Sequence, residues 1–289
     1  MLSIALVAEG IDTLQPSLSE VANALQIQLM RDAGPAWGTT ATCTSFASRS
    51  DVPSNCALLL VVPDTQGDGG LHTAPAGEGF PPSAQVDYTT DGSWTISASH
   101  EAIEMLVDPS GARFQAGPHP TDPLTTVQFL VEACDPCQDP SFAYQVDDQH
   151  SVLLSDCCLP AFYGIGPMGA PFTFRRSVSA PLQIARGGYL SWLDNSKSWY
   201  QMSALSGPTT IGPIDPGDVL KQMEGANLRG TLDRLHGRHG LAAASTRSRT
   251  AAQKKYALIR AHEQGMRRDR DALFEARFPN FSRVKPSVR

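Results

Sequence analysis

His100, Glu101 and Glu104 are residues whose types and spacing could form a metal site. Residues four apart on an α-helix lie on the same face, so His100 and Glu104 would point in the same direction. An imidazole and a carboxylate on one face can together bind a zinc ion. Glu101 stands next to them and could act as the base that takes a proton from a water molecule activated by the metal.

The chain around these residues predicts a helix that is largely buried. We expect it over residues 99–107, with Ser99 as its N-cap, because the segment before Ser99 is typical of a short strand or turn. Apolar residues fill the rest of the helix, and the Asp108-Pro109 pair should end it. A buried carboxylate is costly without a partner, and a metal ion would provide one. The alternative is a solvated helix face that carries an incidental histidine.

A second acidic segment, which contains Glu132 and Asp135, follows further along the chain. A catalytic zinc ion takes three protein ligands and keeps one position open for water. His100 and Glu104 would supply two of these ligands, so a third must come from elsewhere. Glu132 and Asp135 are the two candidates, and the one that does not bind the metal would instead orient His100.

These two segments resemble motifs of a group of zincin-like proteins from bacteria, phages and plants. The group carries a Ser-His-Glu-x-x-Glu-Ala-x-Thr-Asp-Pro helix, followed by Glu-Ile-Gly-Asp-x-Cys. The chain matches this pattern at Ser99, His100, Glu101, Glu104, Asp108, Pro109, Glu132, Asp135 and Cys137. It departs from the pattern at Met105 and Val107, where the group tends to have Ala and Thr. A bacterial and phage branch with Ser-His-Glu-x-x-Glu-Met-Leu-x-Asp-Pro and Cys-Asp-Pro-Cys is more similar.

The resemblance covers residues 1–200 and implies an α+β, zincin-like metalloprotease fold, in which a twisted mixed sheet covers the metal-binding helix. The expected order of elements fits this plan: strand 1–10, helix 18–31, strands 39–46, 57–62 and 84–88, then the motif helix. In such a fold, an edge strand above the helix pairs with an extended substrate. His72 would then line the cleft, and the alternative is that it lies in a surface loop.

The function that these residues indicate is zinc-dependent hydrolysis of a peptide or protein. Glu101 would remove a proton from the attacking water and return it to the leaving amine. Two carboxylate ligands leave zinc less electrophilic than two imidazoles do, so we expect slow turnover or a preference for Mn or Ca. Asp156 and Tyr163 are further candidates near the site, and a tyrosine could stabilise an oxyanion. The alternative is a weakly active or inactive zincin-like structural component of a phage or other particle.

The six cysteines are expected to be reduced thiols, because no secretion signal is evident. Cys134 and Cys137 form a Cys-x-x-Cys pair, which could bind a second zinc ion together with the adjacent Cys157 and Cys158. The alternative is that these four side chains are small buried apolar groups.

Charge divides the chain into an acidic body and a basic tail. The first 220 residues hold 7 Lys/Arg and 23 Asp/Glu, whereas residues 221–289 hold 16 Lys/Arg and 6 Asp/Glu. We therefore expect a zincin-like domain over 1–206, a Gly- and Pro-rich linker over 207–220 and a basic, mostly helical extension over 221–289. The extension suits an acidic partner, such as other particle subunits. Nucleic acid is a weaker alternative, because no known nucleic-acid motif accompanies the basic residues.

The start of the chain favours a first strand over a signal peptide. Its ten apolar residues lack a basic leading segment, and Glu9 interrupts them. No apolar run approaches the ~20 residues that cross a bilayer, so no membrane partner is expected. We therefore expect the protein in the cytoplasm, or packaged in a particle (a virion) that is assembled there.

Overall fold

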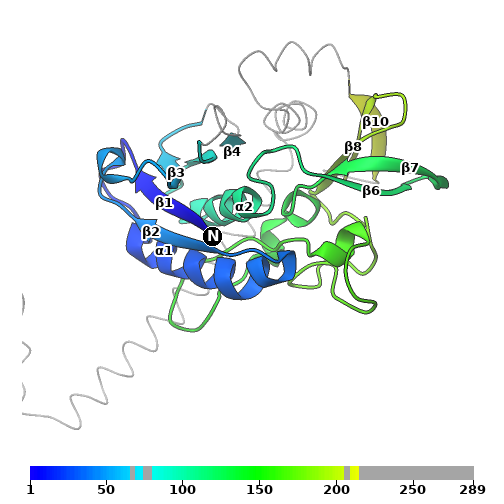
Figure 1. Ribbon diagram of the computed structural model, residues 1–289. Coiled ribbons are helices and arrows are strands. Elements are labelled where there is room, and N and C mark those ends of the chain that lie inside the picture. Colours follow the sequence, from blue (N-terminus) through cyan, green and yellow to red (C-terminus); the bar gives the residue numbers. More distant parts are fainter. Residues whose placement is uncertain (66–68, 74–79, 205–208, 215–289) are drawn as a thin grey trace, which may run out of the picture.

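The computed structural model describes residues 1–65, 69–73, 80–204 and 209–214 (Figure 1). Two five-stranded sheets and two α-helices form most of the regular structure in these residues. The chain is therefore of the α+β class, as the sequence predicts. In the described residues, no helix combines the length and the apolar character that crossing a membrane requires.

The first sheet is mixed, and its antiparallel strand lies at one edge. Its strands are β1 (Leu2–Ala8), β2 (Ala41–Ser45), β3 (Ala57–Val62), β4 (Gly70–Thr73) and β5 (Ser83–Asp87). Their order in space is β2-β1-β3-β5-β4. The first four strands in this order run parallel, and β4 pairs antiparallel with β5. The apolar runs of β1 and β3 occupy the interior of this sheet, as expected for central parallel strands.

Two helices cover the sheet. Helix α1 (Leu18–Ile27) begins at Ser17, whose hydroxyl accepts a hydrogen bond from the Glu20 N–H, and a π-helical turn (Gln28–Ala33) continues it. Helix α1 packs on β1 and β2, whereas helix α2 (Trp94–Val107) packs on β3, β4 and β5. The two helices also contact each other (Figure 1). This packing buries most of α2 and fixes the position of the motif that it carries.

Helix α2 begins five residues before the start that the sequence predicts, so Ser99 is not its N-cap. The Trp94 side chain is buried, its indole N–H donates to the Gln15 carbonyl, and its main-chain N–H donates to the Thr89 hydroxyl. The segment before Ser99 therefore becomes helical because Trp94 anchors it in the core, which outweighs the strand-like residue pattern. The predicted end is confirmed at Asp108, whose N–H donates to the Glu104 carbonyl.

The second sheet is antiparallel throughout. Its strands are β6 (Phe114–His119), β7 (Asp122–Leu130), β8 (Tyr189–Leu193), β9 (Trp199–Ser203) and β10 (Thr210–Ile214), in the order β10-β9-β8-β7-β6. Strand β10 falls inside the linker expected over 207–220 and corrects that boundary, because it is paired along its length with β9. The basic extension over 221–289 lies outside the described residues. Buried residues of both sheets, from Ile4 to Met202, belong to one hydrophobic core.

Candidate metal centre

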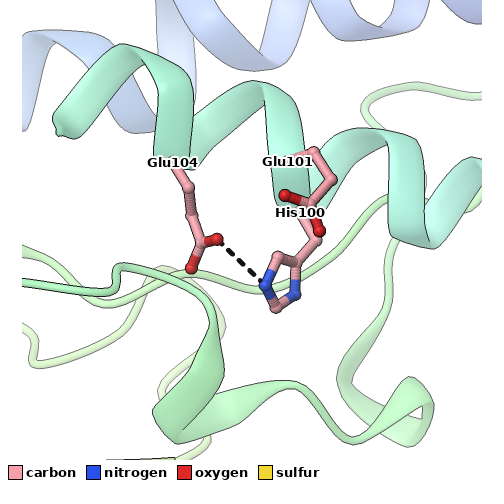
Figure 2. Close-up of side chains that lie close together, drawn as sticks. All are labelled: His100, Glu101 and Glu104. Atoms are coloured by element: carbon pink, nitrogen blue, oxygen red, sulfur yellow. Dashed lines mark ion pairs between the residues drawn. The ribbon is translucent and has the colours of Figure 1, made fainter. Parts of the chain in front are cut away.

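His100, Glu101 and Glu104 come together on helix α2, with donor atoms that all lie within 4.8 Å of one another (Figure 2). His100 Nε2 is 3.1 Å from Glu104 Oε2, and Figure 2 shows the imidazole edge facing that carboxylate. The Glu104 side chain is fully buried, while 14% of the His100 side chain is exposed. The two residues therefore share a face, as their spacing predicts, and His100 connects this buried face with solvent.

Asp135 reaches the same nitrogen from a different part of the chain. It starts the 3-10 turn Asp135–Cys137, and its Oδ1 atom lies 3.1 Å from His100 Nε2. Two ligands that are each about 2.1 Å from a tetrahedral zinc ion lie about 3.4 Å apart. Both contacts of His100 are close to this separation. The second oxygen of Asp135 is buried and makes no hydrogen bond to the described residues.

Glu132, the other candidate for the third ligand, is also buried. Its main-chain carbonyl accepts a hydrogen bond of 2.8 Å from the Tyr163 hydroxyl. In the described part of the chain, the group of three donors within 4.8 Å contains Glu101 and not Glu132. Of the two candidates, Asp135 is the one whose carboxylate directly contacts His100.

Tyr163 does not have the oxyanion-stabilising position considered from the sequence. Its hydroxyl donates to the Glu132 carbonyl and is buried, and burial raises the pKa of this phenol well above its ordinary value. Asp156 likewise has a structural role, because its carboxylate accepts hydrogen bonds from the Cys157 and Arg175 N–H groups and from the Ser177 hydroxyl. Both residues hold loops around the site in place.

Main-chain and side-chain contacts fix the turn that carries Asp135 to the motif helix. The Cys134 N–H donates to Glu104 Oε1 over 3.1 Å, and the Cys134 thiol lies 3.7 Å from the His100 carbonyl. The turn and helix α2 are therefore held together on both sides of the His100–Glu104 pair. This arrangement explains how acids distant in sequence are brought to one imidazole.

Ser99 anchors helix α2 from within. Its hydroxyl donates to Gln28 Oε1 over 2.8 Å and accepts from the Ser155 N–H over 2.9 Å. The Gln28 amide also donates to the Ser155 carbonyl and to the Tyr144 hydroxyl. All of these groups are buried, so Ser99 links the motif helix to the turn after α1 and to the loop at residue 155.

Strand β4 passes directly over Glu101. A Cβ atom placed on Gly70 would lie 2.6 Å from Glu101 Oε1, so only glycine permits this approach. The predicted edge strand above the motif helix is therefore confirmed. His72 lies two residues along β4, on the same side of the strand as Gly70, and is fully buried. It is not in a surface loop, and its burial places it inside the protein and not on the surface of a cleft.

The four cysteines expected as a second metal site are all buried free thiols. The Sγ atoms of Cys137 and Cys158 are 4.0 Å apart. In the described residues, however, the one set of three donors within 4.8 Å is the histidine–glutamate group, so no sulfur site is formed. Burial raises the pKa of each thiol, that of Cys158 to about 11, which keeps them protonated. The alternative, small buried apolar side chains, describes them better.

A pocket of about 320 Å³ opens beside His100. Helix α2 forms one wall of this pocket, and residues that follow β3 and β5 form another. Nothing in the sequence analysis pointed to it, because its lining comes from segments that are far apart in the chain. Polar residues that directly follow buried strands, such as Asp87 after β5, are the signal that could have indicated it.

Comparison with protein-family models, curated proteins and solved structures finds no match to this chain. The chemistry of the site is therefore read from its donor atoms. They are one imidazole nitrogen and several carboxylate oxygens, and such a set suits Zn, Mn or Ca. His100, Glu104 and Asp135 are the residues best placed to hold such an ion.

Proposed function

We propose that this protein is a metal-dependent hydrolase of the zincin type that cleaves a peptide or protein substrate. His100, Glu104 and Asp135 hold a divalent ion, with Glu132 as the alternative third ligand. The observation that carries the proposal is the pair of 3.1 Å contacts that His100 Nε2 makes with carboxylates from two separate segments. The buried Asp135 oxygen without a hydrogen bond to the described residues fits the same donor set.

The arrangement of the first sheet supports this class of enzyme. A mixed sheet lies against the helix that carries the motif, and its antiparallel edge strand β4 passes over Glu101. The outer edge of such a strand has main-chain N–H and C=O groups that an extended peptide can pair with. A substrate bound along β4 therefore lies next to Glu101 and His100.

The chemical roles follow from the positions of the side chains. When bound, a divalent ion lowers the pKa of a water molecule and polarises the scissile carbonyl. Glu101 accepts the proton of the attacking water and delivers it to the leaving amine. Gly70 confines the Glu101 carboxylate from above, and this contact keeps the base directed at the site.

A different explanation of the same contacts has to be separated from this one. A protonated His100 between Glu104 and Asp135 would be a partly buried ion triad that needs no metal. A structural particle component could also keep the site and bind a metal without hydrolysing anything. Metal content distinguishes the first of these from the proposal, and hydrolysis distinguishes the second.

Elemental analysis of the purified full-length protein tests the site. We expect one divalent ion per chain in the wild type and none in His100→Ala. His150→Ala is the matched control, because His150 also pairs with a carboxylate, that of Asp147, but only at the surface. Equal metal content in wild type and His100→Ala would overturn the metal site.

Hydrolysis of an unstructured protein substrate then tests the chemistry. Glu101→Gln removes the base but none of the three proposed ligands, so the variant should keep the ion and lose activity. Hydrolysis at the wild-type rate in Glu101→Gln would overturn the role of Glu101. Metal binding in a wild type that hydrolyses no peptide substrate would support the structural alternative.

A further inference from the structure

We propose that the pocket beside His100 binds a positively charged side chain of the substrate, and that Asp87 is the residue that selects it. This inference rests on the proposed function, because it names the substrate class of the same site. It starts from the one pocket wall that also carries the metal-binding motif.

The pocket continues the face of helix α2 that carries the proposed ligands. Ser93, Ile96, Ser97 and His100 line it, and these positions recur at the spacing of one helix face. From Ser93 to His100 the helix rises about 10 Å. An extended peptide advances about 3.3 Å per residue, so the pocket lies within about three residues of a bond positioned at His100.

The opposite wall connects the pocket to the edge strand. Asp87 ends strand β5, and its N–H donates to the Gly69 carbonyl over 3.0 Å. Gly69 also lines the pocket, and the next residue, Gly70, contacts Glu101. A peptide that follows β4 therefore runs between the pocket and the Glu101 carboxylate, so one of its side chains can enter the pocket.

The polar groups of the pocket favour a cation. Asp87 is the carboxylate in the lining, and neither lysine nor arginine occurs among the described residues that line it. Asp87 is half-buried, and it accepts a hydrogen bond from the Thr65 N–H. A carboxylate accepts several hydrogen bonds, so it can also pair with a guanidinium or ammonium group. The acidic first 220 residues strengthen this preference and disfavour an anion.

The size and apolar parts of the pocket narrow the ligand further. A volume of about 320 Å³ is at the lower end for ligand pockets, which suits one long side chain. Pro63, Ile96 and Pro140 give apolar lining next to the polar groups. Lysine and arginine bury their alkyl stems against such surfaces while the charged end meets a polar partner. The substrate residue in this pocket is therefore lysine or arginine.

A binding experiment tests the pocket without any hydrolysis. The probes are N-butylguanidinium and its uncharged isostere N-butylurea, titrated calorimetrically at low salt into full-length Glu101→Gln protein. We expect N-butylguanidinium to bind at least tenfold more tightly than N-butylurea, and Asp87→Asn to remove this difference. Asp122→Asn is the control, because it removes the same charge from an exposed position. Equal binding of both probes would overturn the proposal.

The Asp87→Asn variant also separates the pocket from the metal ligands, whose acids could attract the cationic probe. Undiminished N-butylguanidinium binding in Asp87→Asn would assign that binding elsewhere and overturn the role of Asp87. Asparagine can still accept the hydrogen bond from Thr65, so the local fold is retained. If the variant fails to fold, the comparison of the two probes on the Glu101→Gln parent still decides.

A peptide library completes the test with the wild-type enzyme. Cleavage should require lysine or arginine within three residues of the scissile bond, and Asp87→Asn should lose this preference at least tenfold. Cleavage with no preference for a cationic residue would overturn the pocket but keep the proposed function. Probe binding without any cleavage would do the reverse.

Discussion

Gly70 on strand β4 and Glu101 on helix α2 are in such close contact that a Cβ atom at residue 70 would lie 2.6 Å from Glu101 Oε1. The atom that would have to move is the end of a flexible side chain, so the fold can accommodate an added methyl group. The Glu101 carboxylate, however, cannot remain where it is. The contact therefore links the edge strand to the position of the proposed base.

The first prediction is that Gly70→Ala lowers kcat at least tenfold with little change in thermal stability or metal content. A displaced base loses its alignment with the attacking water, and small misplacements of catalytic groups cost about 100-fold. Gly212→Ala is the control, because an added Cβ there meets nothing within 4 Å on another edge strand. Wild-type kcat in Gly70→Ala would show that the contact does not position the base.

The second prediction concerns the third metal ligand. Asp135→Asn should weaken metal affinity by at least about tenfold, whereas Glu132→Gln should weaken it less, because Asp135 is the residue in contact with His100. Titration against a competing chelator measures both dissociation constants. The reverse order of the two variants would assign the ligand to Glu132.

The third prediction concerns the anchoring of the motif helix. Ser99→Ala leaves Gln28 Oε1 and the Ser155 N–H without their shared partner in a buried site. The free energy of unfolding should fall by ~1–3 kcal/mol, as measured by urea denaturation. Ser97→Ala, two residues earlier and only half-buried, should change it by less than about 0.5 kcal/mol. Equal effects of the two substitutions would contradict this role of Ser99.

The fourth prediction concerns pH. Burial raises the pKa of Asp156 above its ordinary value, against hydrogen bonds from Ser177 and Arg175 that lower it. Because the folded-state pKa is the higher one, the folded protein binds this proton more tightly than the unfolded chain does. The stabilisation is present below pH ~4 and is lost as the pH rises through the folded-state pKa.

Asp156→Asn cannot ionise, and asparagine keeps an acceptor for the two main-chain N–H groups. The stability of the variant relative to the wild type should therefore increase between about pH 4 and pH 7. Urea denaturation at several pH values measures this difference. Parallel stability curves for the two proteins would contradict the prediction.

Local patterns predicted the parts of the fold that are set by local residues. The apolar runs over 2–8 and 57–62 are strands, and the apolar spacing after Leu18 is helix α1. The shared face of His100 and Glu104 follows from helix geometry alone. The choice between Glu132 and Asp135 could not be made from the sequence, because it depends on how a distant turn packs against α2.

The differences from the sequence analysis have physical causes of the same kind. Strand β10 contains Pro213 and looks like a linker, but it is an edge strand, where proline is tolerated. The start of α2 depends on the burial of Trp94, which local propensity does not report. The four cysteines come near one another without forming a site, because the core packs them as apolar groups.

X-ray absorption spectroscopy of the zinc-loaded protein tests the central claim most directly. Oxygen and nitrogen ligands lie about 2.0–2.2 Å from zinc, whereas thiolate sulfur lies about 2.3 Å away. We predict a shell of oxygen and nitrogen with the scattering of one imidazole, which His100→Ala abolishes. A sulfur shell, or an imidazole signal that survives in His100→Ala, would contradict a metal centre built on His100, Glu104 and Asp135.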